Sequence, residues 1–99
     1  MNTQESMETT TLDEIRGLHI AHTDTGDYFM FNGELKKEFL VKGKITKIRA
    51  GLLFLEIDGE KFSAHKQEGF EAGEEVICYI IPKMKEGIIE FTVRSLEKL

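Results

Sequence analysis

From Leu18 onward, apolar and polar residues alternate in short stretches that are separated by glycines, and this pattern restricts the folds that the chain can adopt. Short apolar runs rich in Ile, Val, Phe and Tyr are separated by Gly, Asp and Asn, and several runs alternate apolar with polar residues. A period of two sends successive side chains to opposite faces of a strand, and such runs bounded by turn residues predict strands. The sequence therefore predicts an all-β or mainly β protein.

Dipeptides ending in glycine mark where the predicted strands reverse. Asn32-Gly33 and Asp58-Gly59 are typical of two-residue type I′ hairpin turns, which need positive φ at both central positions. Ala50-Gly51 predicts a further tight turn. The long strand expected from residue 39 to 49 alternates at first and then changes phase by one residue. That change predicts a β-bulge near Thr46.

The order of the predicted strands indicates an architecture. Strands are expected at residues 18–22, 27–31, 39–49, 52–57, 61–64, 76–83 and 87–96, with Pro82 near the end of the sixth. From residue 37 on, three strands, a short connection and two more strands match a small OB-like antiparallel barrel of five strands. An SH3-like barrel and a plain antiparallel roll are the alternatives. Residues 34–40 can begin either as a helical turn or as a strand.

The domain organisation is simple. Ninety-nine residues suit one domain, which we expect over residues 11–99 with the barrel core at about 37–97. Residues 1–10 are polar and acidic and predict a flexible tail. Thr11 and Glu14 form a capping-box pattern, and Gly17 supplies a stop, so a short helix is expected between tail and strands. This N-terminal helix and hairpin extend the barrel.

The charge distribution and the N-terminal sequence restrict the ligands and the cellular location that we expect. The net charge is −5, and residues 1–35 carry seven acidic side chains against one arginine, a sum of −6, whereas the remaining twelve basic and eleven acidic side chains sum to +1. We therefore expect residues 1–35 to repel a polyanion and residues 36–99 to tolerate one. The N-terminus lacks the basic start and apolar centre of a signal peptide, so we expect a cytoplasmic protein without membrane contact. Cys78, in an apolar run, is expected to be a buried, inert thiol.

A stretch covering residues 40–96 resembles a known family. The run GKITKIRAGLLFLEIDGEKFSAH from Gly43 to His65, followed by FEAGEEV (70–76) and TVRSL (92–96), is similar to the S1-type OB-fold RNA-binding domain. Ala50 stands where that family has an aromatic residue. The resemblance implies an OB barrel that binds single-stranded RNA across its first three strands, with Phe54 and His65 at the binding positions.

The residues themselves also support a nucleic-acid site, independently of the resemblance to the S1-type family. Single-stranded nucleic acid needs basic side chains for its phosphates and an aromatic surface on which bases stack. If Leu53, Leu55 and Ile57 face the core, Phe54 faces outward beside a basic strand. The candidate residues, with RNA favoured over DNA, are Lys42, Lys44, Lys47, Arg49, Phe54, Lys61, His65 and Lys66. The alternative is that the lysines only protect a sheet edge and Phe54 packs under the N-terminal segment.

A protein partner is the competing hypothesis. The aromatic run from Tyr28 to Phe31 lies in the acidic part of the chain, and alternation buries only one of its two sets of side chains. If the other set is uncovered, the hairpin docks on a basic protein partner, with Tyr28, Phe29 and Phe31 as the candidate interface. The chain would then be a small adaptor or inhibitor.

Catalysis and metal binding find little support in the sequence. The pattern His19-x-x-His22-x-Asp24 superficially resembles a ligand set, but residues three apart on a strand point to opposite faces. No nucleophile motif or phosphate loop is present. We therefore expect a non-catalytic binding module without cofactor or metal.

Overall fold

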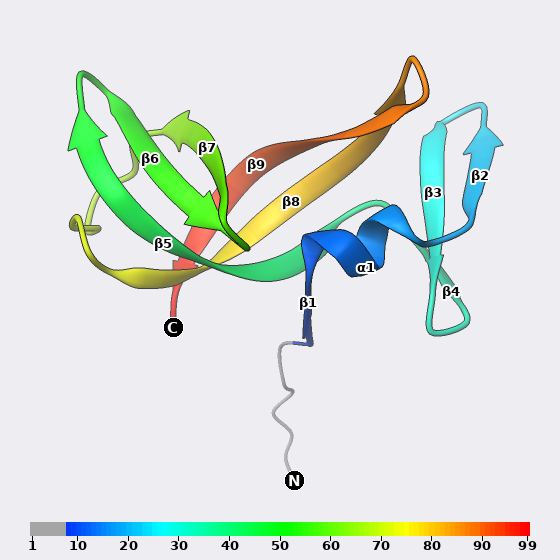
Figure 1. Cartoon of the computed structure of the whole chain (residues 1–99), viewed down its shortest axis with the longest axis horizontal. Coiled ribbons are helices and arrows are strands. Elements are labelled where there is room, and N and C mark those ends of the chain that lie inside the picture. Colours follow the sequence, from blue (N-terminus) through cyan, green and yellow to red (C-terminus); the bar gives the residue numbers. More distant parts are fainter. Residues whose placement is uncertain (1–7) are drawn as a thin grey trace, which may run out of the picture.

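The computed structural model describes residues 8–99, and strands dominate it. The expected tail lies mostly in residues 1–7, outside the described residues. The described residues form one short helix and two sheets, arranged as in Figure 1. The elements are β1 (Thr9–Thr10), α1 (Leu12–Arg16), β2 (Ile20–Thr23), β3 (Gly26–Phe31), β4 (Glu34–Lys36), β5 (Phe39–Arg49), β6 (Leu52–Ile57), β7 (Glu60–His65), β8 (Glu75–Lys85) and β9 (Ile88–Lys98).

The main sheet is antiparallel along the order β7-β6-β5-β8-β9, with β1 added in parallel to β5. It curls into a half-barrel, so that β7 and β9 approach each other across the concave side (Figure 1). In the described chain these two strands share no ladder; Phe62 on β7 and Phe91 on β9 meet edge to face, with ring centroids 6.5 Å apart. The prediction of a mainly β protein is confirmed, whereas a closed five-stranded barrel is not.

The predicted turns and bulge are confirmed. Asn32 and Asp58 have φ values of 51° and 52°, each followed by a glycine with φ above 80°, as type I′ turns require. Ala50 adopts the same conformation at φ 53°. The β5–β6 register shifts between Ile45 and Lys47, which places the bulge at Thr46.

The helix α1 anchors the N-terminal segment on the main sheet. Thr11 and Glu14 form the predicted capping box, and α1 ends at Gly17. Leu12 and Ile15 are fully buried in the core formed with the main sheet. The Leu12 N–H donates to Asp58 Oδ2 at 2.9 Å, in the β6–β7 turn. Arg16 donates two hydrogen bonds of 2.8 Å to the Glu60 carboxylate on β7.

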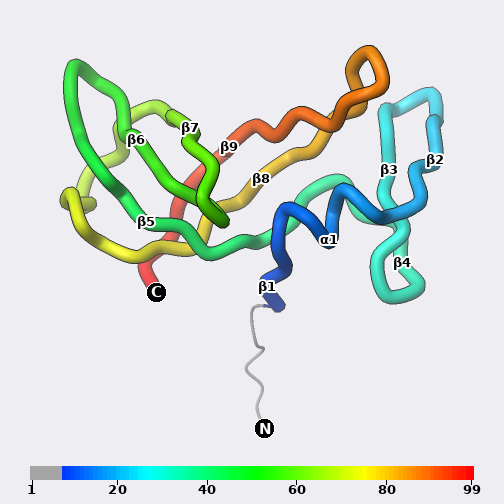
Figure 2. Tube along the Cα trace, viewed as in Figure 1, coloured from blue at the N-terminus to red at the C-terminus, as the bar shows by residue number. Residues whose placement is uncertain are grey.

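The second sheet, β2-β3-β4, packs beside the far end of the β8–β9 hairpin. Figure 2 shows that hairpin reaching from the half-barrel toward β3, where Asp27 Oδ2 accepts a 3.4 Å hydrogen bond from the Met84 N–H. Phe29 is fully buried and meets Phe39 edge to face at 6.2 Å between centroids. The strand alternative for residues 34–40 is correct, because the Asn32-Gly33 turn brings Leu35 back opposite Met30.

Most element boundaries differ from expectation by one or two residues, and two differences bear on how the strands pair. Thr9 and Thr10 pair with Leu40 and Val41 of β5, so strand pairing begins before the expected domain start at residue 11. They occupy the part of the β5 edge that β6 does not reach. The strand β8 continues three residues beyond Pro82. Its pairing with β5 ends at Ile80, so Pro82 lies where β8 bonds only to β9 and a missing N–H breaks no ladder.

The only helix in residues 8–99 is α1, and its five residues are far too few to cross a membrane.

Candidate nucleic-acid interface

The candidate residues gather on the outer face of β5, β6 and β7. Strand pairing sets Lys44 opposite Glu56, Lys47 opposite Phe54, and Arg49 opposite Leu52. Lys44 and Lys47 are three residues apart, which in a regular strand would put them on opposite faces. The bulge at Thr46 absorbs one residue and returns Lys47 and Arg49 to the face of Lys44.

The third strand extends this face. On β7, Lys61 lies opposite Glu56, Ser63 opposite Phe54, and His65 opposite Leu52. Lys66 follows the end of β7, and its backbone N–H donates to the Gly51 carbonyl at 2.9 Å. All six basic candidates and His65 are exposed, whereas Phe54 is half-buried. The basic candidates on this face are Lys42, Lys44, Lys47, Arg49, Lys61 and Lys66.

A groove lies around Phe54. It has a volume of about 400 Å³ and is lined by Thr46, Lys47, Phe54, Leu55, Glu56, Lys61 and Phe62. The Lys47 ammonium lies 5.3 Å from the centroid of the Phe54 ring, in a cation–π contact. The Thr46 hydroxyl donates to the Phe54 carbonyl at 3.2 Å and so ties the bulge to β6. The lining therefore combines two aromatic side chains, two ammonium groups and one carboxylate.

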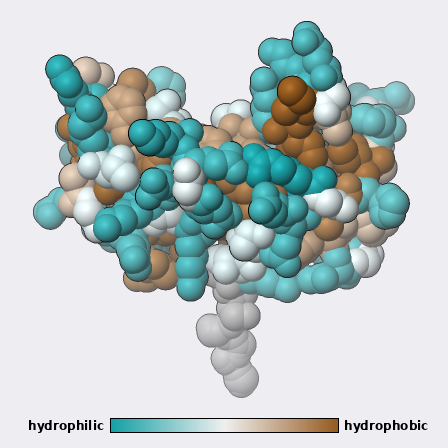
Figure 3. Space-filling model, in the orientation of Figure 1, coloured by the Kyte–Doolittle hydropathy of each residue, from teal (hydrophilic) through white to brown (hydrophobic). Residues whose placement is uncertain are grey.

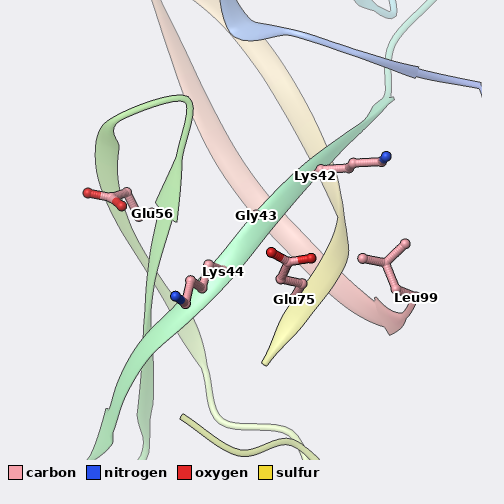
Figure 4. Close-up of a pocket in the computed structure, with 6 residues that line it drawn as sticks. All are labelled: Lys42, Gly43, Lys44, Glu56, Glu75 and Leu99. Atoms are coloured by element: carbon pink, nitrogen blue, oxygen red, sulfur yellow. The ribbon is translucent and has the colours of Figure 1, made fainter. Parts of the chain in front are cut away.

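A shallower hollow of about 210 Å³ lies beside the groove, over Gly43. Figure 4 shows Lys42 and Lys44 pointing apart along β5, with Glu75 of β8 and Leu99 on the opposite side of the hollow from Glu56. Glu56 lines both depressions. The two hollows are therefore neighbours separated by one carboxylate.

The cations of this face are not neutralised by ion pairs. Within residues 8–99, ion pairs engage Arg16, His22, Arg94 and Lys98, and none of them involves a basic side chain of the β5–β7 outer face. Two carboxylates, Glu56 and Glu75, stand among these cations. A positive surface results, although the whole chain carries a charge of −5.

Sequence reasoning did not select Glu56 and Glu75 as site residues. The signal for Glu56 was present, because a two-residue turn at Asp58-Gly59 pairs Ile57 with Glu60 and hence Glu56 with Lys61. Glu75 is different. It enters the site through β5–β8 pairing, which joins segments some thirty residues apart and has no local turn to define it.

The residues of the competing protein interface are only partly accessible. Phe29 is fully buried and is therefore no part of an exposed surface. Phe31 packs edge to face on Phe39 at 5.5 Å between centroids, and the half-buried Tyr28 is covered by Lys37, whose ammonium lies 5.3 Å from the ring centroid. The large apolar side chains exposed on this sheet are Met30 and Leu35, at 42% and 51%.

The face of the molecule drawn in Figure 3 carries both hydrophilic and apolar side chains. Figure 3 shows hydrophilic side chains over most of the visible face, with apolar ones gathered toward the side that holds the β8–β9 hairpin and the small sheet. Met30 and Leu35 are direct cross-strand partners, so they form a small continuous apolar surface.

The histidines and the cysteine are the side chains that the sequence offers as possible metal ligands and as a thiol. No group of three or more His, Cys, Asp or Glu side chains within residues 8–99 is placed to hold a metal ion. His22 Nδ1 lies 2.7 Å from Asp27 Oδ1, and this hydrogen bond lowers the pKa of Asp27. Cys78 is buried, and burial raises the pKa of its thiol to about 11.

Comparison of the chain with models of known protein families, with curated proteins and with solved structures finds no match.

Proposed function

We propose that this protein is a non-catalytic, OB-like module that binds single-stranded nucleic acid on the outer face of β5, β6 and β7. The order β7-β6-β5-β8-β9 supports the OB-like reading, because an OB barrel has its first strand between the second and the fourth. The preference for RNA over DNA rests on the resemblance of residues 40–96 to the S1-type domain. A cytoplasmic location accords with such a ligand.

The observation that carries the proposal is a row of unpaired cations beside a half-buried aromatic ring. Within residues 8–99, Lys44 and Lys47 make no ion pair although carboxylates occupy the adjacent strands. Cations that only protected a sheet edge would belong on an edge strand. The strand β5 instead lies at the centre of the sheet, between β6 and β8.

The geometry suits a strand of nucleotides running along β5. Lys42 to Arg49 spans seven residues, or about 20 Å at roughly 3.3 Å per residue, which is room for several phosphates. A base stacked on Phe54 would displace the Lys47 ammonium from the ring, and that ammonium is then free for a phosphate. Stacking of this kind contributes about 1 to 3 kcal/mol per base.

Fluorescence anisotropy with a labelled octauridine, measured over a range of salt concentrations, tests the proposal. Six contacting cations give a slope of log K against log salt of up to about −4.2, at roughly 0.7 per phosphate contact. Lys44→Glu should weaken binding about tenfold or more. Lys85→Glu, with the same charge change on an exposed lysine at the far end of β8, should leave it within about twofold. Equal effects of the two variants, or binding that does not depend on salt, would contradict the proposal.

The aromatic contribution needs its own variant. Phe54→Leu keeps an apolar side chain against the sheet but removes the ring, so folding is retained while stacking is lost. We expect an affinity loss of about 5-fold or more for octauridine. An unchanged affinity would restrict the site to the phosphate backbone and remove Phe54 from it.

A protein partner is the second candidate, favoured by one observation. Met30 and Leu35 are exposed and lie opposite each other on β3 and β4, in the acidic front of the chain. An adaptor or inhibitor would use this apolar pair against a basic protein surface. Affinity capture with the wild type and with Met30→Ser tests it. One dominant basic protein, lost with the variant, supports this function; identical captures from both proteins count against it.

A further inference from the structure

The carboxylate of Glu56 is misplaced for a surface that binds phosphates alone. It lines both hollows of the outer face and is the one carboxylate that lines the groove around Phe54. A negative charge in this position repels any polyanion. Glu56 therefore favours binding only where it accepts hydrogen bonds from the ligand.

The carboxylate is also free to do so. Glu56 lies directly opposite Lys44 on one neighbouring strand and Lys61 on the other. Within residues 8–99 it nevertheless forms no ion pair and no side-chain hydrogen bond, while Glu38, Glu60 and Glu74 are all paired. Its oxygens remain exposed as acceptors.

The spacing connects this acceptor to the aromatic ring. Phe54 and Glu56 are two residues apart on β6, so their side chains share one face about 6.5 Å apart. A base stacked on Phe54 would bring one edge toward the Glu56 carboxylate. The ammonium groups of Lys47 and Lys61 line the same groove.

The chemistry of the bases then discriminates among them. Guanine carries two adjacent donors, N1–H and the N2 amine, which match the two oxygens of a carboxylate, and its O6 and N7 accept from a lysine. Adenine and cytosine each offer one amine next to a ring-nitrogen acceptor that faces the carboxylate unfavourably. Uracil offers one N–H between two carbonyl oxygens.

We propose that Glu56 makes the groove selective for guanine, accepting from N1–H and the N2 amine of a base stacked on Phe54 while Lys47 or Lys61 donates to O6. This inference rests on the proposed nucleic-acid function and adds a base preference to it. The preferred ligand is a single strand that contains guanine.

Anisotropy titrations with uridine octamers that hold one central guanosine, inosine, adenosine or cytidine test the inference. The guanosine octamer should bind about 5- to 50-fold more tightly than the others. Inosine lacks only the N2 amine, and so it should lose most of that advantage. Circular dichroism of the two protein variants described next would establish that these exposed substitutions leave the fold intact.

Two matched variants separate the outcomes. Glu56→Gln should abolish the guanosine preference while binding of the other octamers stays equal or becomes tighter, since one negative charge is removed. Glu75→Gln makes the same charge change in the neighbouring hollow and should keep the preference. If no octamer binds, the proposed function fails together with this inference. If all octamers bind equally, or the preference survives Glu56→Gln, base selection by Glu56 is overturned and the proposed function stands.

Discussion

Replacing Asp58 by alanine should weaken the attachment of α1 to the main sheet. The Asp58 carboxylate accepts a 2.9 Å hydrogen bond from the N–H of Leu12, the first residue of α1. The first N–H groups of a helix have no partner within the helix. Alanine offers no acceptor, so the Leu12 N–H is left unsatisfied above a fully buried side chain. An unsatisfied buried donor costs about 1 to 3 kcal/mol, and a charged acceptor favours the upper half of that range.

The backbone adds a smaller contribution. Asp58 has a φ of 52°, a conformation that Asp and Asn adopt more readily than alanine. Ala50 occupies the same conformation at φ 53°, so alanine is accommodated there in this fold. Asn32→Ala, at φ 51°, measures this cost together with the loss of an exposed 3.1 Å hydrogen bond from Asn32 Nδ2 to Glu8, at a turn that makes no bond to α1. We expect less than about 1 kcal/mol for it.

The whole effect of Asp58→Ala is then about 2 to 4 kcal/mol, or a fall in Tm of roughly 8 to 30 °C for a domain of this size. Thermal and urea unfolding followed by circular dichroism would measure it, and amide exchange at Leu12 should become faster. Asp58→Asn retains both an acceptor and the turn conformation, and should cost less than about 1 kcal/mol. If Asp58→Ala is no worse than Asn32→Ala, or Asp58→Asn is as damaging as alanine, the hydrogen bond does not anchor α1.

Three further predictions concern the core and the charges around α1. A Cβ at Gly43 would lie 2.9 Å from Cys78 Sγ, so Gly43→Ala should lower the free energy of unfolding by about 1 to 3 kcal/mol. Adding Cys78→Ala should recover part of that loss, and strict additivity of the two substitutions in the double-mutant cycle would disprove the clash. Because burial raises the pKa of Cys78 to about 11, the native protein at pH 8 should resist iodoacetamide until urea unfolds it, and rapid native labelling by mass spectrometry would be the opposite result. The hydrogen bond from Arg16 lowers the pKa of Glu60 below its usual 4.5, so the pair stabilises the fold above pH 4.5 and this contribution is lost as the pH falls through the lowered pKa. The free energy of unfolding should therefore fall less steeply with acid for Glu60→Gln than for the wild type, and parallel pH dependences of the two proteins would argue against the pair.

The features of the fold that were predicted correctly depend on neighbours in the sequence. The turns at Asn32-Gly33 and Asp58-Gly59 require positive φ at two adjacent residues, and few dipeptides satisfy that requirement. The capping box at Thr11 needs only residues three apart. The bulge at Thr46 follows from a change of phase within one strand. Each of these can be derived without knowing the rest of the chain.

The features that were missed depend on segments distant in the sequence. Two residues, Thr9 and Thr10, are too short a strand to carry a periodic pattern, and only the edge that β6 leaves uncovered on β5 gives them a partner. Pro82 looks like a strand end, and only the strand order shows that its missing N–H costs no ladder bond. Which aromatic set of β3 faces inward depends on Phe39, which meets Phe29 and Phe31 from another sheet.

The candidate site likewise has a part that depends on neighbours in the sequence and a part that depends on distant segments. The outward face of β5 and the position of Phe54 opposite Lys47 follow from alternation, one bulge and one turn, all of which are local. The opposition of Glu75 to Lys44 depends on β8 joining β5 across a long connection. Glu75 is therefore the acidic residue that the sequence concealed. Glu56, to which we assign base selection, follows from the local turn that sets it opposite Lys61.

A single backbone irregularity makes the core and the candidate site compatible. Ile45 and Ile48 are three residues apart, yet Ile45 is buried and Ile48 packs against the same core. In a regular strand one of them would face water, and Lys47 would point inward with a charge that burial cannot tolerate unpaired. The extra residue at Thr46 reverses the alternation, and its hydroxyl bonds to the Phe54 carbonyl across the strands. The same bulge thus keeps both isoleucines in the core and brings Lys44, Lys47 and Arg49 into one outward row, so a substitution that removed the bulge would be expected to impair stability and ligand binding together.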